Sequence, residues 1–292
     1  GYQANLQARS LAGGQTNLIG LLVVDLTTQY MGEIIGAIDD TLAASQYELM
    51  LFTTHRRRTR ESIYINMMAR GLADGLLIVL PRDPQAYLSS LRERKFPYVL
   101  IDQFGEDESD ISVTAANQQG GYEATKHLID LGHRRIAFMH GQEASLLTKD
   151  REDGYRAAMA AAGIDIEDGW ITGGNLTIRG SIDATHRLLN HRNRPTAVFC
   201  ANDEMAMGLL HGVKTAGLKV PHDLSVMGFD DVRYAEILDP PLTTVRQPAR
   251  QIGERVMQRL FKEIEDGLSV TADPEIVPYE LVIRESVAPP RS

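Results

Sequence analysis

The sequence predicts an α/β protein with two lobes, each a doubly wound parallel sheet covered by helices. Short apolar runs alternate with helical patterns about every 25 residues, a spacing typical of βαβ units. The early runs are continuous rather than alternating, as strands buried on both faces of a parallel sheet are. The same series starts again after Gly132. One fold is therefore used twice along the chain.

In the first lobe, helical segments separate the strands. The clearest helix places Ile34, Ile38 and Leu42 on one face, at the spacing that packs a helix against a sheet. Four buried strands are predicted, at Ile19–Asp25, Glu48–Phe52, Gly75–Leu80 and Tyr98–Asp102.

The second lobe repeats this order. Its strands are predicted at Arg135–His140, Ala197–Ala201 and Leu224–Phe229, and its helices at Asp150–Ala162, Ser181–Leu189 and Glu204–Ala216. A last helix at Ala249–Glu265 and a strand at Glu280–Ile283 follow, and we expect them to return and close the lobes.

Composition excludes several classes of protein. With 30 Lys and Arg against 39 Asp and Glu, the 292-residue chain carries a formal charge of −9, so its bulk is not a DNA-binding surface. No apolar run approaches the roughly 18 residues that span a bilayer. The single cysteine, Cys200, cannot form an internal disulfide, and no secretion signal opens the chain. We expect a cytoplasmic protein without a membrane partner, and Gly1 in place of Met indicates a segment missing upstream.

Familiar catalytic and metal-binding motifs are missing from the sequence. It contains no GxSxG nucleophile elbow, no phosphate-binding loop, no HExxH pair and no CxxC. The eight histidines show no metal-ligand spacing, and Cys200 lies in a buried strand, where a structural thiol is expected. We therefore expect no catalytic residue, no cofactor and no metal.

Four polar clusters stand where predicted strands end. They are Thr27–Tyr30, Asp150 with Arg151, Asn202 with Asp203, and Asp230 with Asp231. Because the carboxyl ends of parallel strands share one edge, we expect the clusters to converge on a crevice between the lobes. An arginine fork, carboxylates and an amide together match the hydroxyl groups of a sugar or polyol.

Two other interpretations of the carboxylates remain open. Asp203 and Asp231 precede helical segments, so both suit the N-cap position of a helix. Asp203 and Asp230 also suit the carboxylate pair of a sugar hydrolase.

Motifs along almost the whole chain resemble one family. They are Ala8-Arg9-Ser10-Leu11 in a hinge-like start, Leu131–Ala137, Arg151 with Gly154-Tyr155, Ala201-Asn202-Asp203, Val226–Asp231, and Pro241–Val245 with Gln247. In this order they resemble the lactose/galactose repressor (LacI/GalR) family of bacterial transcription regulators. Each motif alone is weak evidence, whereas six in sequence are strong.

The resemblance implies a periplasmic-binding-protein-like fold of type I, with two lobes joined by three crossovers. The expected boundaries are residues 1–17 for a hinge or linker, 18–131 with 248–276 for the N-terminal lobe, and 132–247 with 277–288 for the C-terminal lobe. The implied function is the ligand-sensing and dimerisation core of a DNA-binding regulator, a repressor controlled by a sugar or related small molecule. Family members carry a helix-turn-helix headpiece ahead of the hinge, which this sequence lacks.

The hinge is the part of the chain that the resemblance assigns to DNA. Asn5, Ala8, Arg9 and Leu11 look like hinge residues that contact the minor groove, with Leu11 as the wedge that unstacks a base step. Composition alone is also consistent with a frayed terminus or linker. Ala4 stands where a proline commonly precedes the hinge helix.

The effector contacts implied by the resemblance come from both lobes. The second lobe is expected to supply Arg151, Asn202, Asp230 and Gln247, and the first Thr27, Thr28, Tyr30 and Met31. Leu176 stands where many sugar-binding members have an aromatic residue. Tyr30 is the candidate to replace that stacking surface.

The expected partners are a small-molecule effector, operator DNA and a second copy of the chain. No heptad run follows Pro289, so a homodimer is expected rather than a tetramer. The alternative function is a periplasmic-type sugar-binding protein for transport, which shares the fold and the crevice. The hinge motif and the missing secretion signal disfavour it.

Overall fold

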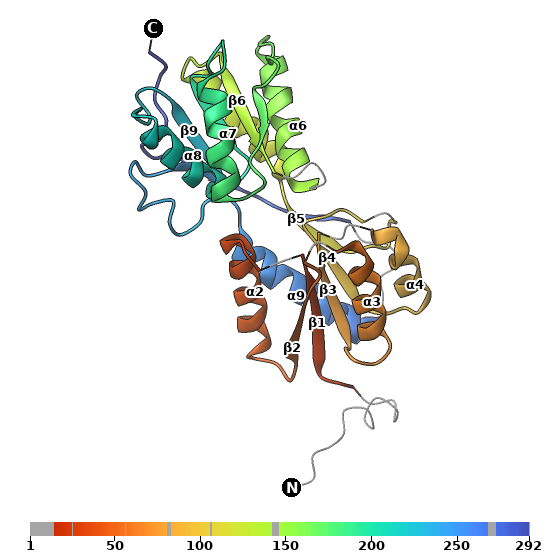
Figure 1. Cartoon of the computed structure of the whole chain (residues 1–292). Coiled ribbons are helices and arrows are strands. Elements are labelled where there is room, and N and C mark those ends of the chain that lie inside the picture. Colours follow the sequence, from red (N-terminus) through yellow and green to blue (C-terminus); the bar gives the residue numbers. More distant parts are fainter. Residues whose placement is uncertain are drawn as a thin grey trace. The chain divides into compact units, whose positions relative to one another are not determined.

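The chain forms two compact units. The computed structural model describes residues 15–24, 26–55, 57–80, 83–105, 107–141, 146–267 and 273–291. Unit 1 runs to Ala115 and takes in Pro248–Val277, and unit 2 comprises Ala116–Gln247 and the chain from Pro278 (Figure 1). The chain therefore passes from one unit to the other three times, as the family resemblance implies.

Unit 1 contains a six-stranded parallel sheet. The strand bounds are Leu18–Val23 (β1), Glu48–Thr53 (β2), Gly75–Val79 (β3), Tyr98–Ile101 (β4), Ser112–Ala115 (β5) and Glu275–Val277 (β11). They lie in the order β11-β5-β4-β3-β1-β2, and each neighbouring pair is parallel. The four predicted strands are confirmed, whereas β5 and β11 were not predicted.

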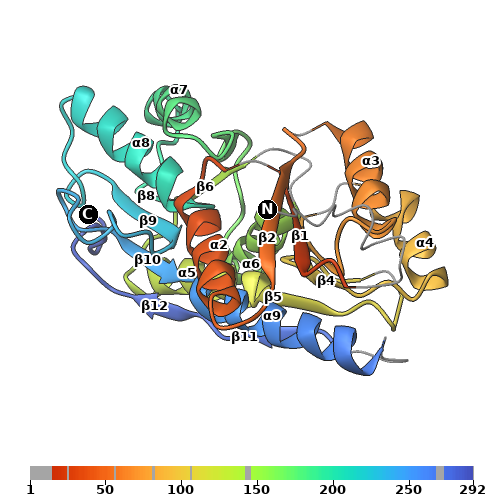
Figure 2. The same ribbon diagram turned by 90° about the horizontal axis from the view of Figure 1, so that it is seen from below.

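Helices cover both faces of this sheet. Their bounds are Gln29–Leu42 (α2), Arg58–Ala69 (α3), Leu88–Glu93 (α4) and Ala249–Asp266 (α9), with a 3-10 turn η1 at Pro84–Ala86. In β1, Ile19, Leu21 and Val23 pack in the cluster with α2 and α9, whereas Leu22 packs in the cluster with α3 and α4. Figures 1 and 2 show these helices around the strands of the sheet. Because successive side chains of a strand point to opposite faces, one continuous apolar run serves both layers.

Strand β2 differs from the buried strand that the sequence predicts. It lies at the edge of the sheet and pairs only with β1 among the described strands. Glu48 and Leu51 are exposed, Leu51 by 37% of its surface. An apolar run at a sheet edge is thus indistinguishable by sequence from one in the centre.

Unit 2 contains a second six-stranded sheet. The strand bounds are Ile136–His140 (β6), Ile171–Gly173 (β7), Ala197–Cys200 (β8), Ser225–Asp230 (β9), Thr243–Arg246 (β10) and Glu280–Val282 (β12). They lie in the order β12-β10-β9-β8-β6-β7 (Figure 2), and only the pair of β10 and β12 is antiparallel. The four predicted strands are confirmed, whereas β7 and β10 were not predicted.

The helices of unit 2 include one that the sequence assigned to the other lobe. The bounds are Asn117–Asp130 (α5), Leu146–Ala161 (α6), Ile178–Leu189 (α7) and Asp203–Thr215 (α8). α5 packs against α6 almost backbone to backbone: a Cβ added to Gly121 would lie 2.4 Å from the Arg151 carbonyl oxygen, and one added to Gly154 2.2 Å from that of Gln118. This contact places α5 in unit 2, whereas the expected lobe boundary followed residue 131.

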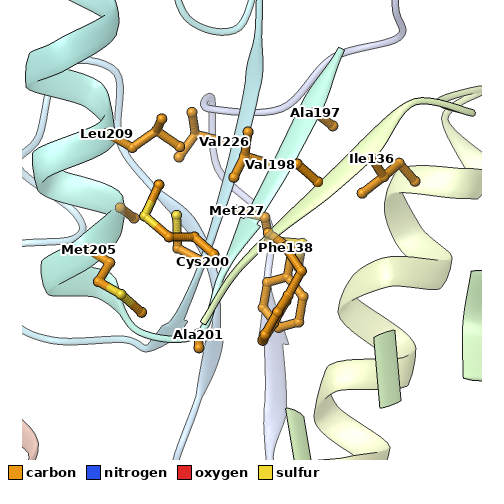
Figure 3. Close-up of a cluster of buried hydrophobic side chains, with 14 of the residues drawn as sticks. Ile136, Phe138, Ala197, Val198, Cys200, Ala201, Met205, Leu209, Val226 and Met227 are labelled. Atoms are coloured by element: carbon orange, nitrogen blue, oxygen red, sulfur yellow. The ribbon is translucent and has the colours of Figure 1, made fainter. Parts of the chain in front are cut away.

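Aromatic and sulfur-containing side chains fill the core of unit 2. Phe138 of β6 stacks on Tyr155 of α6 with ring centroids 5.4 Å apart, and meets Phe199 of β8 edge-on at 5.3 Å. Figure 3 shows Met205 of α8 beside β8, the strand that carries Cys200. Complete burial raises the pKa of the Cys200 thiol, so the expectation of a structural thiol is confirmed.

The longest helix, α9, shows the amphipathic pattern of a globular fold. Ile252, Val256 and Leu260 recur every four residues and are fully buried against the sheet of unit 1. Within the described ranges, no helix combines the length and the apolar character needed to cross a membrane.

The glycine contact between α5 and α6 gives the first testable prediction. Gly154→Ala forces the two helices apart, so it should lower the free energy of unfolding of unit 2 by about 1–3 kcal/mol or more. Urea denaturation followed by the fluorescence of the single tryptophan, Trp170, a buried residue of unit 2, measures this loss.

The matched control is Gly36→Ala in α2 of unit 1, where an added Cβ meets nothing within 4 Å. It should leave the Trp170 transition unchanged. Equal midpoints for the Gly154→Ala variant and the unaltered protein would show that the helix contact is not close enough to matter.

Candidate functional site

Polar side chains gather at the carboxyl edge of the sheet of unit 2. Asp230 ends β9, Gln247 follows β10, and Ala201 with Asn202 follows β8. Arg151 reaches the same edge from α6. Asp230, Gln247, Ala201 and Asn202 end or follow parallel strands, so their common edge follows from the topology, whereas Arg151 lies within a helix. The sequence analysis expected four polar clusters to converge on a crevice between the lobes. Within unit 2, Arg151, Asp230 and Gln247 lie together, and the crevice stays a prediction.

Arg151 is held from several sides. Its Nε donates to Asn117 Oδ1 at 2.9 Å, and its Nη1 donates to the Ala201 carbonyl and to Asp230 Oδ1, the latter at 3.3 Å. Its Cζ lies 3.8 Å from the centroid of the Phe229 ring, a cation–π contact. The side chain is only 3% exposed. Among the described residues, Nη2 has no hydrogen-bond partner, so one arm of a fixed guanidinium fork is available to a ligand.

Asp230 and Gln247 complete this group. Asp230 Oδ1 accepts from Arg151 and also from Gln247 Nε2, at 2.7 Å. Gln247 is 4% exposed, and its Oε1 is buried without a hydrogen-bond partner in the described structure. An unpaired buried carbonyl costs about 1–3 kcal/mol, so a ligand donor at this atom would be favoured. Asn117, Arg151, Asp230 and Gln247 are called the Arg151 cluster below.

Asn202 caps a helix rather than joining the Arg151 cluster directly. Its Oδ1 accepts from the Met205 N–H at 2.9 Å, and its backbone is extended, as at an N-cap. Asp203 is the first residue of α8, so the alternative that Asp203 is the N-cap is wrong. The same alternative is wrong for Asp231, which begins no helix and instead pairs with Arg246 and Arg284.

Asp203 is a fully buried carboxyl group that ties three segments together. Its Oδ1 accepts from the Thr244 hydroxyl at 2.6 Å, and its Oδ2 accepts from the Val232 N–H at 2.9 Å. Burial, followed by the nearby charge of Asp230, raises the pKa of Asp203 well above its ordinary value, although both hydrogen bonds act to lower it. With both oxygens engaged inside unit 2, Asp203 is not placed to act on a sugar, which argues against the hydrolase alternative.

In unit 1, the predicted residues lie at the start of α2. Thr28 is the N-cap, and its Oγ1 accepts from the Met31 N–H at 3.4 Å. The Tyr30 hydroxyl donates to the carboxylate of Asp102, at 2.9 and 3.1 Å from its two oxygens. Tyr30 and Met31 are buried in the core of unit 1, whereas Thr27 is exposed. The Tyr30 ring packs in the core of unit 1, and its role as a stacking surface stays a prediction.

Three contributors were not predicted from the sequence. Asn117 and Phe229 position Arg151, and Asp102 holds Tyr30. Asp102 directly follows β4, and Asn202 stands two residues after the end of β8, so this strand-end signal was available. For Leu176, the structure shows packing against the core of unit 2, with its Cγ 2.7 Å from where a Cβ on Gly141 would lie.

Some sequence predictions find no test in the described residues. The hinge residues Asn5, Ala8, Arg9 and Leu11 lie outside them.

In the part of the chain that the structure describes, His, Cys, Asp and Glu side chains form no group of three placed to hold a metal ion.

Comparisons with known proteins agree on one family. The model of the periplasmic binding protein-like domain matches residues 125–287. The "HTH-type transcriptional repressor PurR" of Photobacterium profundum is 35% identical over 287 residues, which cover 98% of this chain and 86% of that protein. The chain is thus similar to a repressor over nearly its whole length.

Solved structures show the same relationship. The lac repressor dimer bound to operator and the anti-inducer ONPF has a TM-score of 0.88 at 25% identity, covering 99% of this chain and 100% of that one. A LacI family transcriptional regulator of Enterococcus faecium with bound ribose has a TM-score of 0.83 at 26% identity, covering 94% of this chain and 100% of that one.

Asp203 gives a prediction for the pH dependence of stability. The pKa of Asp203 is higher in the folded protein than in the unfolded chain, where it is about 3.9. The stability that Asp203 contributes is therefore fully present below the unfolded pKa, and it is lost as pH rises through the folded pKa. Asp203→Asn cannot ionise. The free energy of unfolding of the unaltered protein, minus that of the variant, should therefore fall as pH rises.

Urea denaturation at a series of pH values, followed by Trp170 fluorescence, measures this difference. Parallel pH profiles for the two proteins would contradict the assignment of a raised pKa to Asp203.

Proposed function

Because the chain belongs to the LacI/GalR family of transcriptional regulators and is the ligand-sensing core of a repressor, we propose that its effector is a sugar or related polyol. Arg151, Asn202, Asp230 and Gln247 of unit 2 bind this effector. It acts reversibly, without turnover, and needs neither a metal nor a cofactor.

The observation that carries the proposal is the hydrogen-bonding state of the Arg151 cluster. Arg151 offers Nη2 as a donor, Gln247 offers Oε1 as an acceptor, and Asp230 presents a carboxylate between them. Sugar hydroxyl groups both donate and accept, so adjacent hydroxyls satisfy such a mixed set. The similarity to a regulator with bound ribose supports the same ligand class.

The residues of unit 1 complete the proposed contact set. Thr27, Thr28, Tyr30 and Met31 stay a prediction from the family resemblance, supported by their position at the N-terminal turn of α2. Of these, Thr27 is exposed and Thr28 is half-buried, whereas Tyr30 and Met31 are buried, as are most of the proposed contacts of unit 2.

DNA binding and dimerisation belong to the same proposal. The protein acts in the cytoplasm as a homodimer, which brings two hinge segments to the operator. In each hinge, Asn5, Ala8, Arg9 and Leu11 contact the minor groove. The lac repressor dimer on its operator supports this assembly. The net charge of −9 agrees with confining DNA contacts to a small part of the protein.

The effector controls DNA binding by favouring one conformation of the core. It shifts the equilibrium only by its differential affinity for the two states, and a coupling of about 1–3 kcal/mol changes operator affinity about 5- to 150-fold. The transport function is not favoured, because the relatives that match nearly the whole chain are repressors.

A thermal-shift screen tests the proposed ligand class. Sugars, sugar phosphates, polyols and nucleobases are added in turn, and a sugar or polyol should raise the melting temperature because it binds only the folded protein. Asp230→Asn and Gln247→Leu should each weaken that ligand about tenfold or more, since each removes a buried hydrogen-bonding group.

The control is Asp183→Asn, which removes the same charge from an exposed position of α7 in unit 2. It should leave the ligand affinity unchanged. A sugar shift that persists in Asp230→Asn would contradict the site, and a shift seen with nucleobases alone would contradict the sugar class.

A further inference from the structure

A concave site lies at the edge of the sheet of unit 2 opposite the Arg151 cluster. A pocket of about 270 Å³ is lined by the segments that precede β6, β8 and β9, together with the C-terminal segment. Its polar lining includes Arg135, Arg194, Thr196, His222, Asp223 and Arg291. We call it the amino-edge pocket.

Positive charge dominates the amino-edge pocket. Three arginines face one carboxylate, that of Asp223. Arg135 and Arg194 form no ion pair within the described structure: Arg135 Nε donates to the Arg194 carbonyl at 3.0 Å, and Arg194 Nη2 to the Asp223 carbonyl at 3.5 Å. These bonds hold the guanidinium groups in place without neutralising them.

Asp223 cannot neutralise the pocket by itself. Its Oδ2 accepts from the Lys219 N–H at 2.8 Å and its Oδ1 lies 3.0 Å from His222 Nδ1, while Arg291 Nη1 is 3.9 Å away. Two arginine charges are therefore left uncompensated in a concave site, on a chain whose net charge is −9. A site of this kind attracts an anion.

His133 is a neutral part of the wall of the pocket. His133 Nδ1 lies 2.8 Å from Thr196 Oγ1, and its Nε2 lies 2.9 Å from the Ala288 carbonyl. Burial lowers the pKa of His133, which keeps the ring uncharged. The ring thus links three segments around the pocket, those that precede β6 and β8 and the C-terminal segment.

We propose that the amino-edge pocket binds the phosphate group of a small metabolite. A tetrahedral phosphate accepts hydrogen bonds from several directions, and arginine forks meet it two bonds at a time. Its charge of about −1.5 to −2 at neutral pH matches the uncompensated charge of Arg135 and Arg194. The volume is below the roughly 300–1,000 Å³ of drug-sized sites, so the ligand is small.

This pocket does not overlap the residues proposed for the effector. Arg194 and Thr196 precede β8, whereas Ala201 follows it. The four residues of β8 separate the two edges by roughly 13 Å at 3.3 Å per residue. The amino-edge pocket therefore admits a second ligand alongside the effector, and its test does not depend on the Arg151 cluster.

Isothermal titration calorimetry tests the proposal with inorganic phosphate and glucose 6-phosphate as probes and glucose as the uncharged comparison. We expect both phosphates to bind, and Arg194→Gln to weaken them about tenfold or more, because a charge-assisted hydrogen bond is lost. Arg291→Gln should weaken them as well. Since the Arg291 side chain is 65% exposed, this variant removes charge without disturbing the fold.

The matched control is Arg134→Gln. Arg134 is exposed, and within the described ranges it bonds only the backbone carbonyls of Ile129 and His133; it does not line the pocket. It should leave phosphate affinity unchanged. If Arg134→Gln and Arg194→Gln weaken phosphate binding equally, the loss reflects the net charge of the protein and not the pocket, and the proposal is overturned. Absence of phosphate binding at millimolar concentration would overturn it too.

Discussion

The candidate effector site of unit 2 depends on the buried ion pair of Arg151 and Asp230. The two side chains are 3% and 8% exposed, and Arg151 Nη1 lies 3.3 Å from Asp230 Oδ1. Removing one partner of such a pair costs about 3–5 kcal/mol, because an uncompensated charge stays buried. The 3.3 Å separation is longer than the roughly 2.7–2.9 Å of a strong charged hydrogen bond. Folding has already removed water from both charges, so a ligand that bonds both groups gains binding free energy without that desolvation cost.

Contacts from neighbouring elements of unit 2 hold this pair in place. Gly121 and Gly154 let α5 and α6 approach, which brings Asn117 within 2.9 Å of Arg151. Asp203 fixes the segments around Asp230 by accepting from Val232 and Thr244. Asp230 itself has a φ of 116°, a backbone conformation that side-chain-bearing residues rarely adopt, and such strain is characteristic of functional positions.

Regular elements were predictable from the sequence because they depend on local pattern. The apolar runs in the sequence predicted the bounds of β1, β3, β6 and β8 to within two residues. Features set by tertiary contact were not: β2 is an edge strand, and α5 belongs to unit 2. In the site, Arg151, Asp230 and Gln247 were predicted and do meet. Their positioning partners Asn117 and Phe229 were missed, because no local pattern marks a residue that acts through another.

The most direct measurement is hydrogen–deuterium exchange of the protein with and without its sugar ligand. Exchange should slow in the peptides that contain Ala201–Asn202 and Asp230–Val232, because a ligand bound to Arg151 and Asp230 closes the loops that follow β8 and β9. Protection confined to other segments, with these two unchanged, would contradict the account.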